Sequence, residues 1–249
     1  KNYSIMSVKL NLIEAKITND SEISTVIKNT ICNDWKATFD SASEELDFLS
    51  QIIKKNELIN GMCFPNKQNI FRAFQLTPLS KVKAVFLSTK PYDKVDLSDG
   101  SPLANGLAFS VNENCTMPKE LLALYREVAS SVATFTIPTH GNLTSWALEG
   151  ILLLNLSLTV SPGIPGSHGE IWIGFIAKVI ETLAVNKPTV PFVLFGELTK
   201  KVANLISGQS LIVTTTTPSH KKFATSECIK KVIAHLEKNK IAPINWTIK

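Results

Sequence analysis

The sequence predicts an α/β protein with three layers, in which helices cover both faces of a central four-stranded, mainly parallel sheet. Four short apolar runs, rich in branched and aromatic residues, are typical of strands that are buried on both faces. Amphipathic stretches of helical period separate these runs. Each run also ends in small or polar residues, which is typical of a sheet with a ligand site at the carboxyl ends of its strands.

The composition is that of one large domain. The chain has 249 residues, of which 44% are hydrophobic and 19% charged, and this length is sufficient for one complete core. We expect a single domain over residues 1–249, with a helical N-terminal part at 1–60 and a motif-bearing core at 61–249.

Several classes of protein are excluded at this stage. No stretch approaches about 18 consecutive apolar residues and the start lacks a signal-like apolar core, so we expect a soluble intracellular protein without membrane association. The cysteines lie far apart, with no CxxC pair and no histidine at ligand spacing, which favours reduced, packed thiols. We therefore expect no metal and no cofactor. The cysteines are Cys32, Cys63, Cys115 and Cys228.

The N-terminal part is expected to be helical over residues 21–58, where Trp35 and Phe39 belong to an apolar stripe interrupted by acidic residues. A short helical turn at 69–74 then precedes the first strand, which begins at Val82. This part of the chain contributes packing rather than chemistry.

Beyond the first strand, a polar loop at 93–105 and a short apolar piece at 106–111 precede Pro118, which opens a helix. The later elements are expected in the order strand 151–155, helix 172–183, strand 191–196, helix 197–206, strand 211–215 and helix 223–236.

Polar residues follow all four strands and indicate a site at one edge of the sheet. They are Lys90 and Tyr92, then Asn155, then Gly196 and Glu197, and finally the segment 217–220. Residues 59–249 also contain 19 Lys and Arg against 12 Asp and Glu, an excess of seven positive charges in a chain whose net charge is +5. A basic excess near such an edge favours a crevice that binds a phosphate or a base.

From about Phe64 to Trp246 the chain resembles the family 1 uracil-DNA glycosylases. The resemblance rests on the order and spacing of several motifs. STKPYD at 88–93 occupies the position of the family's water-activating loop GQDPYH, and GLAFSV at 106–111 is similar to the piece with the uracil-stacking phenylalanine. The most similar run is GNLTSWALEGILLLNLSLTV at 141–160, and TTPSH at 216–220 and PINW at 243–246 complete the set.

The resemblance implies a uracil-DNA glycosylase-like fold and a base pocket made of Thr89, Tyr92, Phe109 and Asn155. Tyr92 would exclude a 5-methyl group, Phe109 would stack on the base, and Asn155 would read its edge. Loops that contact the DNA backbone would contain Ser88, Pro118, Ser167, His168, Gly196, Ser219, Lys221 and Lys222.

Two departures lie where the family performs its chemistry. Cleavage of the base–sugar bond passes through a cationic sugar, and the carboxylate that stabilises it is replaced here by Lys90. At about 4 Å and an effective dielectric constant of about 20, the reversal of sign raises the barrier by roughly 8 kcal/mol, or about five to six orders of magnitude in rate. Thr217 replaces the histidine that donates to the uracil oxygen, and the loss of such a donor costs about 2.7–4 kcal/mol.

Further departures concern DNA binding. Asp93 occupies the position of the loop histidine, and Glu197 stands where the family has the serine of its glycine-serine loop. The loop after Ser219 is shorter and lacks the apolar residue that would enter the base stack when a base is flipped.

Three hypotheses follow. The first is a glycosylase-fold protein that has lost ordinary uracil excision and acts as a DNA- or protein-binding factor, with a partner in a replication or repair complex. The second is an active glycosylase for uracil or another modified base, in which Lys90 serves as an amine nucleophile. The third is a protein-interaction module without DNA binding. The first hypothesis predicts a nuclear location if the source is eukaryotic or viral.

Overall fold

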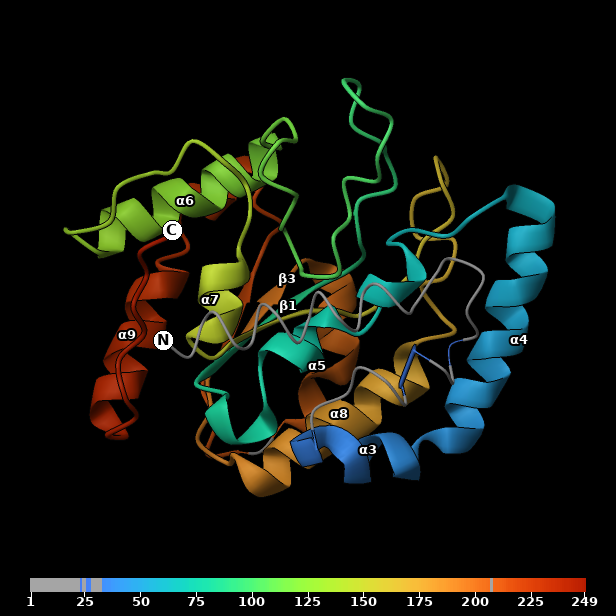
Figure 1. The fold of residues 1–249 in the computed structure, drawn as a ribbon. Helices are drawn as coiled ribbons and strands as arrows, with labels where there is room; N and C mark the ends of the chain where they lie inside the picture. The colour runs from blue at the N-terminus through green and yellow to red at the C-terminus, as the bar shows by residue number, and fades with distance from the viewer. Residues whose placement is uncertain (1–22, 24–25, 28–32, 207) are drawn as a thin grey trace.

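A parallel sheet of four strands forms the centre of the molecule (Figure 1). The computed structural model describes residues 23, 26–27, 33–206 and 208–249. The strands are β1 (Ala84–Ser88), β2 (Ile151–Asn155), β3 (Phe192–Phe195) and β4 (Ile212–Thr215), in the order β2-β1-β3-β4. The predicted fold class is therefore confirmed.

The burial of each strand follows from its place in the sheet. Every residue of β1, β2 and β3 is buried, as their continuous apolar runs require. In the edge strand β4, Ile212 and Thr214 are exposed, whereas Val213 between them is buried. The alternation in β4 is expected of a strand with one face toward solvent.

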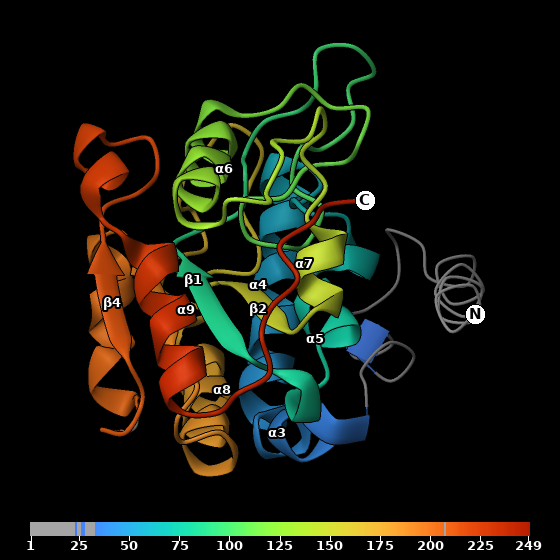
Figure 2. The same cartoon turned by 90° about the vertical axis from the view of Figure 1, so that its left-hand side faces the viewer.

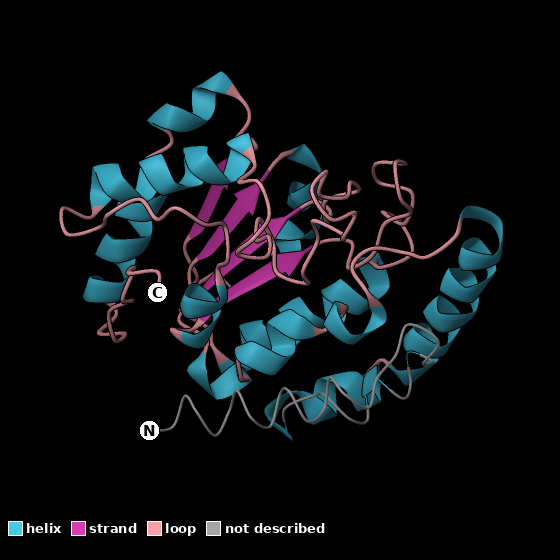
Figure 3. Ribbon diagram, turned by 45° about the horizontal axis from the view of Figure 1, so that its top comes forward, coloured by secondary structure: helices cyan, strands magenta, loops and turns pink. Residues whose placement is uncertain are grey.

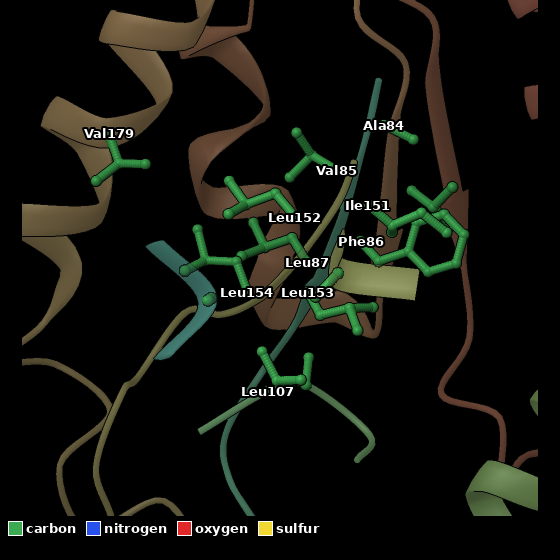
Figure 4. Packing of buried hydrophobic residues seen from close by; sticks show 14 of the residues in the cluster. Ala84, Val85, Phe86, Leu87, Leu107, Ile151, Leu152, Leu153, Leu154 and Val179 are labelled. Carbon is green, nitrogen blue, oxygen red and sulfur yellow. The ribbon is translucent and has the colours of Figure 1, made fainter. Parts of the chain in front are cut away.

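Register divides the side chains of β1 and β2 between the two faces of the sheet. Val85 pairs with Leu152 and Leu87 with Leu154, and these four side chains lie toward Val179 of helix α8 (Figure 4). The alternate residues face the other way, where the ring of Phe86 lies 6.3 Å from that of Trp246. The last register pair is Ser88 with Asn155, so the sheet ends in two polar residues side by side.

One face of the sheet is covered by α8 (Ile173–Asn186) and by the 3-10 helix η4 (Glu197–Leu205). Helices α3 (Lys36–Ser41) and α4 (Ser43–Asn60) pack on the outside of α8. The Thr38 hydroxyl donates to the Thr182 hydroxyl at 3.0 Å, and Glu45 pairs with Lys178 at 3.2 Å. The N-terminal helices are therefore joined to the core by both polar and apolar contacts.

The opposite face is covered by α6 (Lys119–Ser131), α7 (Thr144–Leu148) and α9 (Cys228–Lys238), so helices lie on both sides of the sheet (Figures 2 and 3). Short α5 (Arg72–Leu76) packs against α7 and β2. Trp146 of α7 donates from Nε1 to the carbonyl of Trp246 at 2.8 Å, which fixes the C-terminal segment against the core. The remaining 3-10 helices are η1 (Asn33–Trp35), η2 (Lys67–Asn69), η3 (Leu79–Lys81) and η5 (Lys221–Thr225).

Several expected elements differ from the observed ones. The helical stretch predicted at 21–58 is divided between α3 and α4 at Ala42, and part of it lies outside the described residues. The helix predicted at 197–206 is a 3-10 helix, the piece at 106–111 forms turns and loop, and α7 was not predicted.

The structure also describes the state of three cysteines and the character of the helices. Cys63, Cys115 and Cys228 are buried free thiols, whereas Cys32 lies outside the described residues. In the described part of the chain, every helix is too short or too polar to cross a membrane.

Candidate functional site

A cavity of about 150 Å³ opens at the carboxyl ends of β1 and β2. Residues from three strand tips meet there: Ser88 at the end of β1 with Thr89 and Lys90 after it, Asn155 at the end of β2, and the segment 217–219 after β4. An engineered cavity of this volume accepts a benzene-sized ring, so the space is sufficient for one six-membered base. All four residues predicted to form the base pocket line this cavity: Thr89, Tyr92, Phe109 and Asn155.

Asn155 is the last residue of β2, and backbone pairing continues beyond it. The amide of Leu156 donates to the carbonyl of Ser88 at 2.7 Å, and that of Ser157 to the carbonyl of Thr89 at 3.1 Å. These bonds hold the two loops beside each other past the end of the sheet. Asn155 is only 5% exposed, and its Oδ1 has no hydrogen-bond partner among the described residues. A buried acceptor without a partner is costly, and here it lines a cavity in which a ligand could satisfy it.

Lys90 lines the same cavity as one half of an ion pair. Its Nζ lies 3.1 Å from Oδ1 of Asp93, three positions later in the chain, and the two side chains are 34% and 12% exposed. Asp93 itself is absent from the cavity wall. The positive charge at the cavity is thus balanced by a carboxylate that is not part of the cavity wall.

Tyr92 and Phe109 form the aromatic part of the wall. The hydroxyl of Tyr92 donates to the carbonyl of Phe109 at 3.2 Å, and burial, with a smaller effect of the Glu120 charge, raises the pKa of Tyr92. The chain turns at Phe109, whose φ is 65°, and Ala108 donates to the carbonyl of Leu153 at 3.0 Å. The ring of Phe109 packs 4.8 Å from that of Phe195, edge to face. Phe109 is therefore held by both β2 and β3.

Gly196 permits the close approach of two cavity loops. Its φ is 89°, and a Cβ added to it would lie 3.1 Å from Cγ2 of Thr217 and 3.4 Å from Cγ2 of Thr89. Thr217 and Ser219 both line the cavity, and their hydroxyls are hydrogen-bonded to each other at 3.0 Å. Only glycine adopts such a φ without strain, so Gly196 sets the position of the loop after β4.

The other residues predicted for DNA-contacting loops lie outside the cavity. His168 is 1% exposed, and its two ring nitrogens contact the hydroxyls of Thr159 and Ser161 at 2.8 and 3.1 Å. Ser167 is exposed and accepts from the amide of Ser161. His168 thus supports its loop from inside. Pro118 precedes α6, and Lys221 and Lys222 are exposed in η5.

A second hollow, of about 260 Å³, adjoins the cavity and shares Pro218 and Ser219 with it. Arg126, His220 and Lys221 contribute positive or titratable groups to it, and Glu127 is also part of its wall. A basic hollow beside a base-sized cavity could hold a phosphate of a nucleic acid backbone.

Glu120 is a cavity residue that the sequence did not reveal. It lies in the first turn of α6, is partly exposed and has neither a hydrogen bond nor an ion pair with any described residue. An acid in the first turn of a helix is common because it favours the helix dipole, so the residue type carried no functional signal. Among the described residues no group of three or more His, Cys, Asp or Glu side chains could hold a metal ion.

Curated relatives of known name are similar to most of the chain, although no protein-family model matches it. The uracil-DNA glycosylase of Neisseria meningitidis serogroup B (strain MC58) is 35% identical over 202 residues, which cover 79% of this chain and 90% of that protein. The uracil-DNA glycosylase of Photorhabdus laumondii is 34% identical over 221 residues, which cover 86% and 95%.

Solved structures support the same fold. The mimivirus uracil-DNA glycosylase superposes with a TM-score of 0.80 at 24% identity and covers 92% of this chain and 91% of that one. A variant of the mimivirus protein in complex with UGI gives a TM-score of 0.81, also at 24% identity, and covers 92% of each chain.

Proposed function

Because the chain belongs to the uracil-DNA glycosylase family, a family of DNA repair, we propose that it binds DNA and holds a base in the cavity but does not excise uracil at an ordinary rate. The observation that carries the proposal is the state of Lys90. At the position where the resemblance implies a carboxylate, the cavity receives an ammonium that is already paired with Asp93.

The Lys90–Asp93 ion pair changes the expected effect of Lys90 on the barrier to cleavage of the base–sugar bond. A bare ammonium would both remove the stabilising carboxylate and repel a cationic sugar. With Asp93 3.1 Å away, the two charges nearly cancel at longer range, so much of the repulsion is lost. The missing attraction remains and is worth about 4 kcal/mol at an effective dielectric constant of about 20, which corresponds to about three orders of magnitude in rate.

The base-binding half of the proposal is supported by Asn155. Asn155 lines the cavity together with Tyr92 and Phe109, and its Oδ1 has no hydrogen-bond partner among the described residues. A planar base would give the acceptor a donor and the rings a contact surface, as in enzymes that bind an extruded base. The basic hollow next to the cavity supports a phosphate contact at the same edge.

A second candidate is an active glycosylase, and a specific observation favours it. Glu120 brings a carboxylate to the cavity from α6, although the β1 loop brings none. A negative charge near a cationic sugar would lower the barrier. Lys90 is a poorer candidate for catalysis as an amine nucleophile, because its Nζ is already engaged with the carboxylate of Asp93, 3.1 Å away.

A binding experiment tests the proposal. An end-labelled single-stranded oligonucleotide would carry one base, cytosine or uracil, between tetrahydrofuran abasic spacers, and a second would be abasic throughout. Fluorescence anisotropy would give the dissociation constants. We expect at least one base-containing strand to bind about tenfold more tightly than the abasic strand, since a buried acceptor gains a partner and a ring is stacked.

Asn155→Ala should remove this difference, whereas Asn186→Ala, at the exposed end of α8, should retain it. Equal binding of all strands to the wild-type protein would contradict base binding. Absence of binding to every strand would contradict the proposal as a whole and favour a protein-interaction module instead.

The proposal includes a protein partner within a replication or repair complex, which the membership of a DNA repair family supports. It also includes an intracellular location, with the nucleus as the site if the source is eukaryotic or viral.

A further inference from the structure

We propose that Glu120 determines which base the cavity takes, and that the cavity favours an amino-bearing six-membered base of the cytosine class over uracil. The inference rests on the proposed function, because it concerns the base that occupies the same cavity. It is drawn from two residues that line the cavity, Asn155 and Glu120, because neither Oδ1 of Asn155 nor the carboxylate of Glu120 has a hydrogen-bond partner among the described residues.

The first acceptor is fixed in position. Asn155 ends β2, pairs in register with Ser88 and is 5% exposed, and the backbone bonds from Leu156 and Ser157 hold the segment that follows. A buried oxygen without a hydrogen-bond partner favours a ligand that donates a hydrogen bond to it.

The second acceptor comes from a different element. Glu120 projects from the first turn of α6 into the cavity wall, where its charge contributes to the raised pKa of Tyr92. Within the described part of the chain no cation neutralises it, since Lys90, the cationic side chain of the cavity, is paired with Asp93. The Glu120 carboxylate is therefore available to accept a hydrogen bond from a ligand in the cavity, and it would repel a carbonyl oxygen placed against it.

Cytosine and uracil differ in the hydrogen-bonding group that they would present to these two acceptors. Both have a carbonyl at position 2. At position 4 cytosine has an amino group with two N–H donors, whereas uracil has a carbonyl that only accepts. The amino group can donate one hydrogen to Asn155 and the other to Glu120. Uracil can satisfy Asn155 through its ring N–H, but it has no second donor on that edge for Glu120.

The test compares single-stranded oligonucleotides that contain one base between tetrahydrofuran abasic spacers, with cytosine, uracil or no base at the central position. Dissociation constants are measured by fluorescence anisotropy for the wild-type protein, for Glu120→Gln and for Glu181→Gln. Glu181→Gln is the matched control because it removes the same charge from an exposed position on α8. A hydrogen bond to a charged group changes affinity by about tenfold.

We expect wild-type protein and Glu181→Gln to bind the cytosine strand about tenfold more tightly than the uracil strand. In Glu120→Gln the preference should fall to about twofold or reverse, because the glutamine amide can donate to the carbonyl of uracil.

Equal affinity of the wild-type protein for cytosine and uracil would overturn the inference and leave base binding intact, as would a preference that survives in Glu120→Gln. Equal affinity for all three strands, or no binding at all, would overturn both the inference and the proposed function.

Discussion

Nζ of Lys90 lies 3.1 Å from Oδ1 of Asp93, within one short loop that follows β1. From the sequence alone, these residues are two separate departures from the family's water-activating loop. The structure joins them, because the lysine faces the cavity and the carboxylate that balances it does not. The loop thus contains a positive and a negative charge. It presents the lysine to the cavity, whereas the family resemblance implies a carboxylate at that position.

The first prediction concerns this ion pair. Asp93→Asn should strengthen binding to single-stranded DNA by about fivefold, because it frees the Lys90 ammonium and removes a negative charge. The slope of log affinity against log salt should become steeper by about 0.7 if Lys90 then contacts one phosphate. Unfolding free energy should change by less than about 1 kcal/mol, since the pair is partly exposed. Anisotropy titrations at several salt concentrations measure both quantities.

Asp99→Asn is the control for this experiment. Asp99 lies in the same loop region and accepts from the amide of Ser101, without a lysine partner among the described residues. If Asp99→Asn strengthened DNA binding as much as Asp93→Asn, the effect would be one of net charge and not of the Lys90 pair.

The second prediction concerns Gly196. Gly163→Ala should lower the free energy of unfolding by about 1–2 kcal/mol, because its backbone is left-handed. Gly196→Ala should lower it by more. Both glycines have a positive φ, but a new Cβ meets Thr217 and Thr89 only at Gly196. Urea denaturation measures these costs, and Gly208→Ala, which has neither feature, should change little.

Gly196→Ala should also weaken base-dependent binding, because it displaces the two loops that carry Thr89 and Thr217. Equal unfolding costs for Gly196→Ala and Gly163→Ala would mean that the predicted contact is absent.

The sequence predicted the sheet well because buried parallel strands have an unmistakable apolar signature. The strand 151–155 coincides with β2, and β1 begins two residues after Val82 because η3 ends just before that residue. Helix α7 was not predicted, since five residues carry too little periodicity, and the burial of Trp146 holds it in place. Contacts between particular side chains could not be predicted from the sequence. Neither the Lys90–Asp93 ion pair nor the position of Glu120 at the cavity follows from spacing in the chain.

The third prediction concerns His168. Burial lowers the pKa of His168 below its usual value of 6.5. The unfolded chain therefore binds a proton at this residue more readily than the folded protein as the pH falls below about 6.5, and the free energy of unfolding decreases. The slope from this residue is at most about 1.4 kcal/mol per pH unit. Urea denaturation between pH 5 and 7 should show a shallower dependence for His168→Gln than for wild type.

The exposed His220 gives the matched control. His220→Gln should retain the wild-type dependence on pH. A wild-type slope that persists in His168→Gln would show that other groups cause it and would contradict the burial of a neutral imidazole at this position.

The loss of ordinary uracil excision can be measured as uracil release from a single-stranded oligonucleotide with one uracil, under single-turnover conditions and beside the Neisseria meningitidis relative. We predict that the wild-type chain is at least about three orders of magnitude slower than the relative, and that Lys90→Asp combined with Thr217→His is faster than wild type. Release by the wild-type chain at the rate of the relative would show that Lys90 and Thr217 have not removed uracil excision.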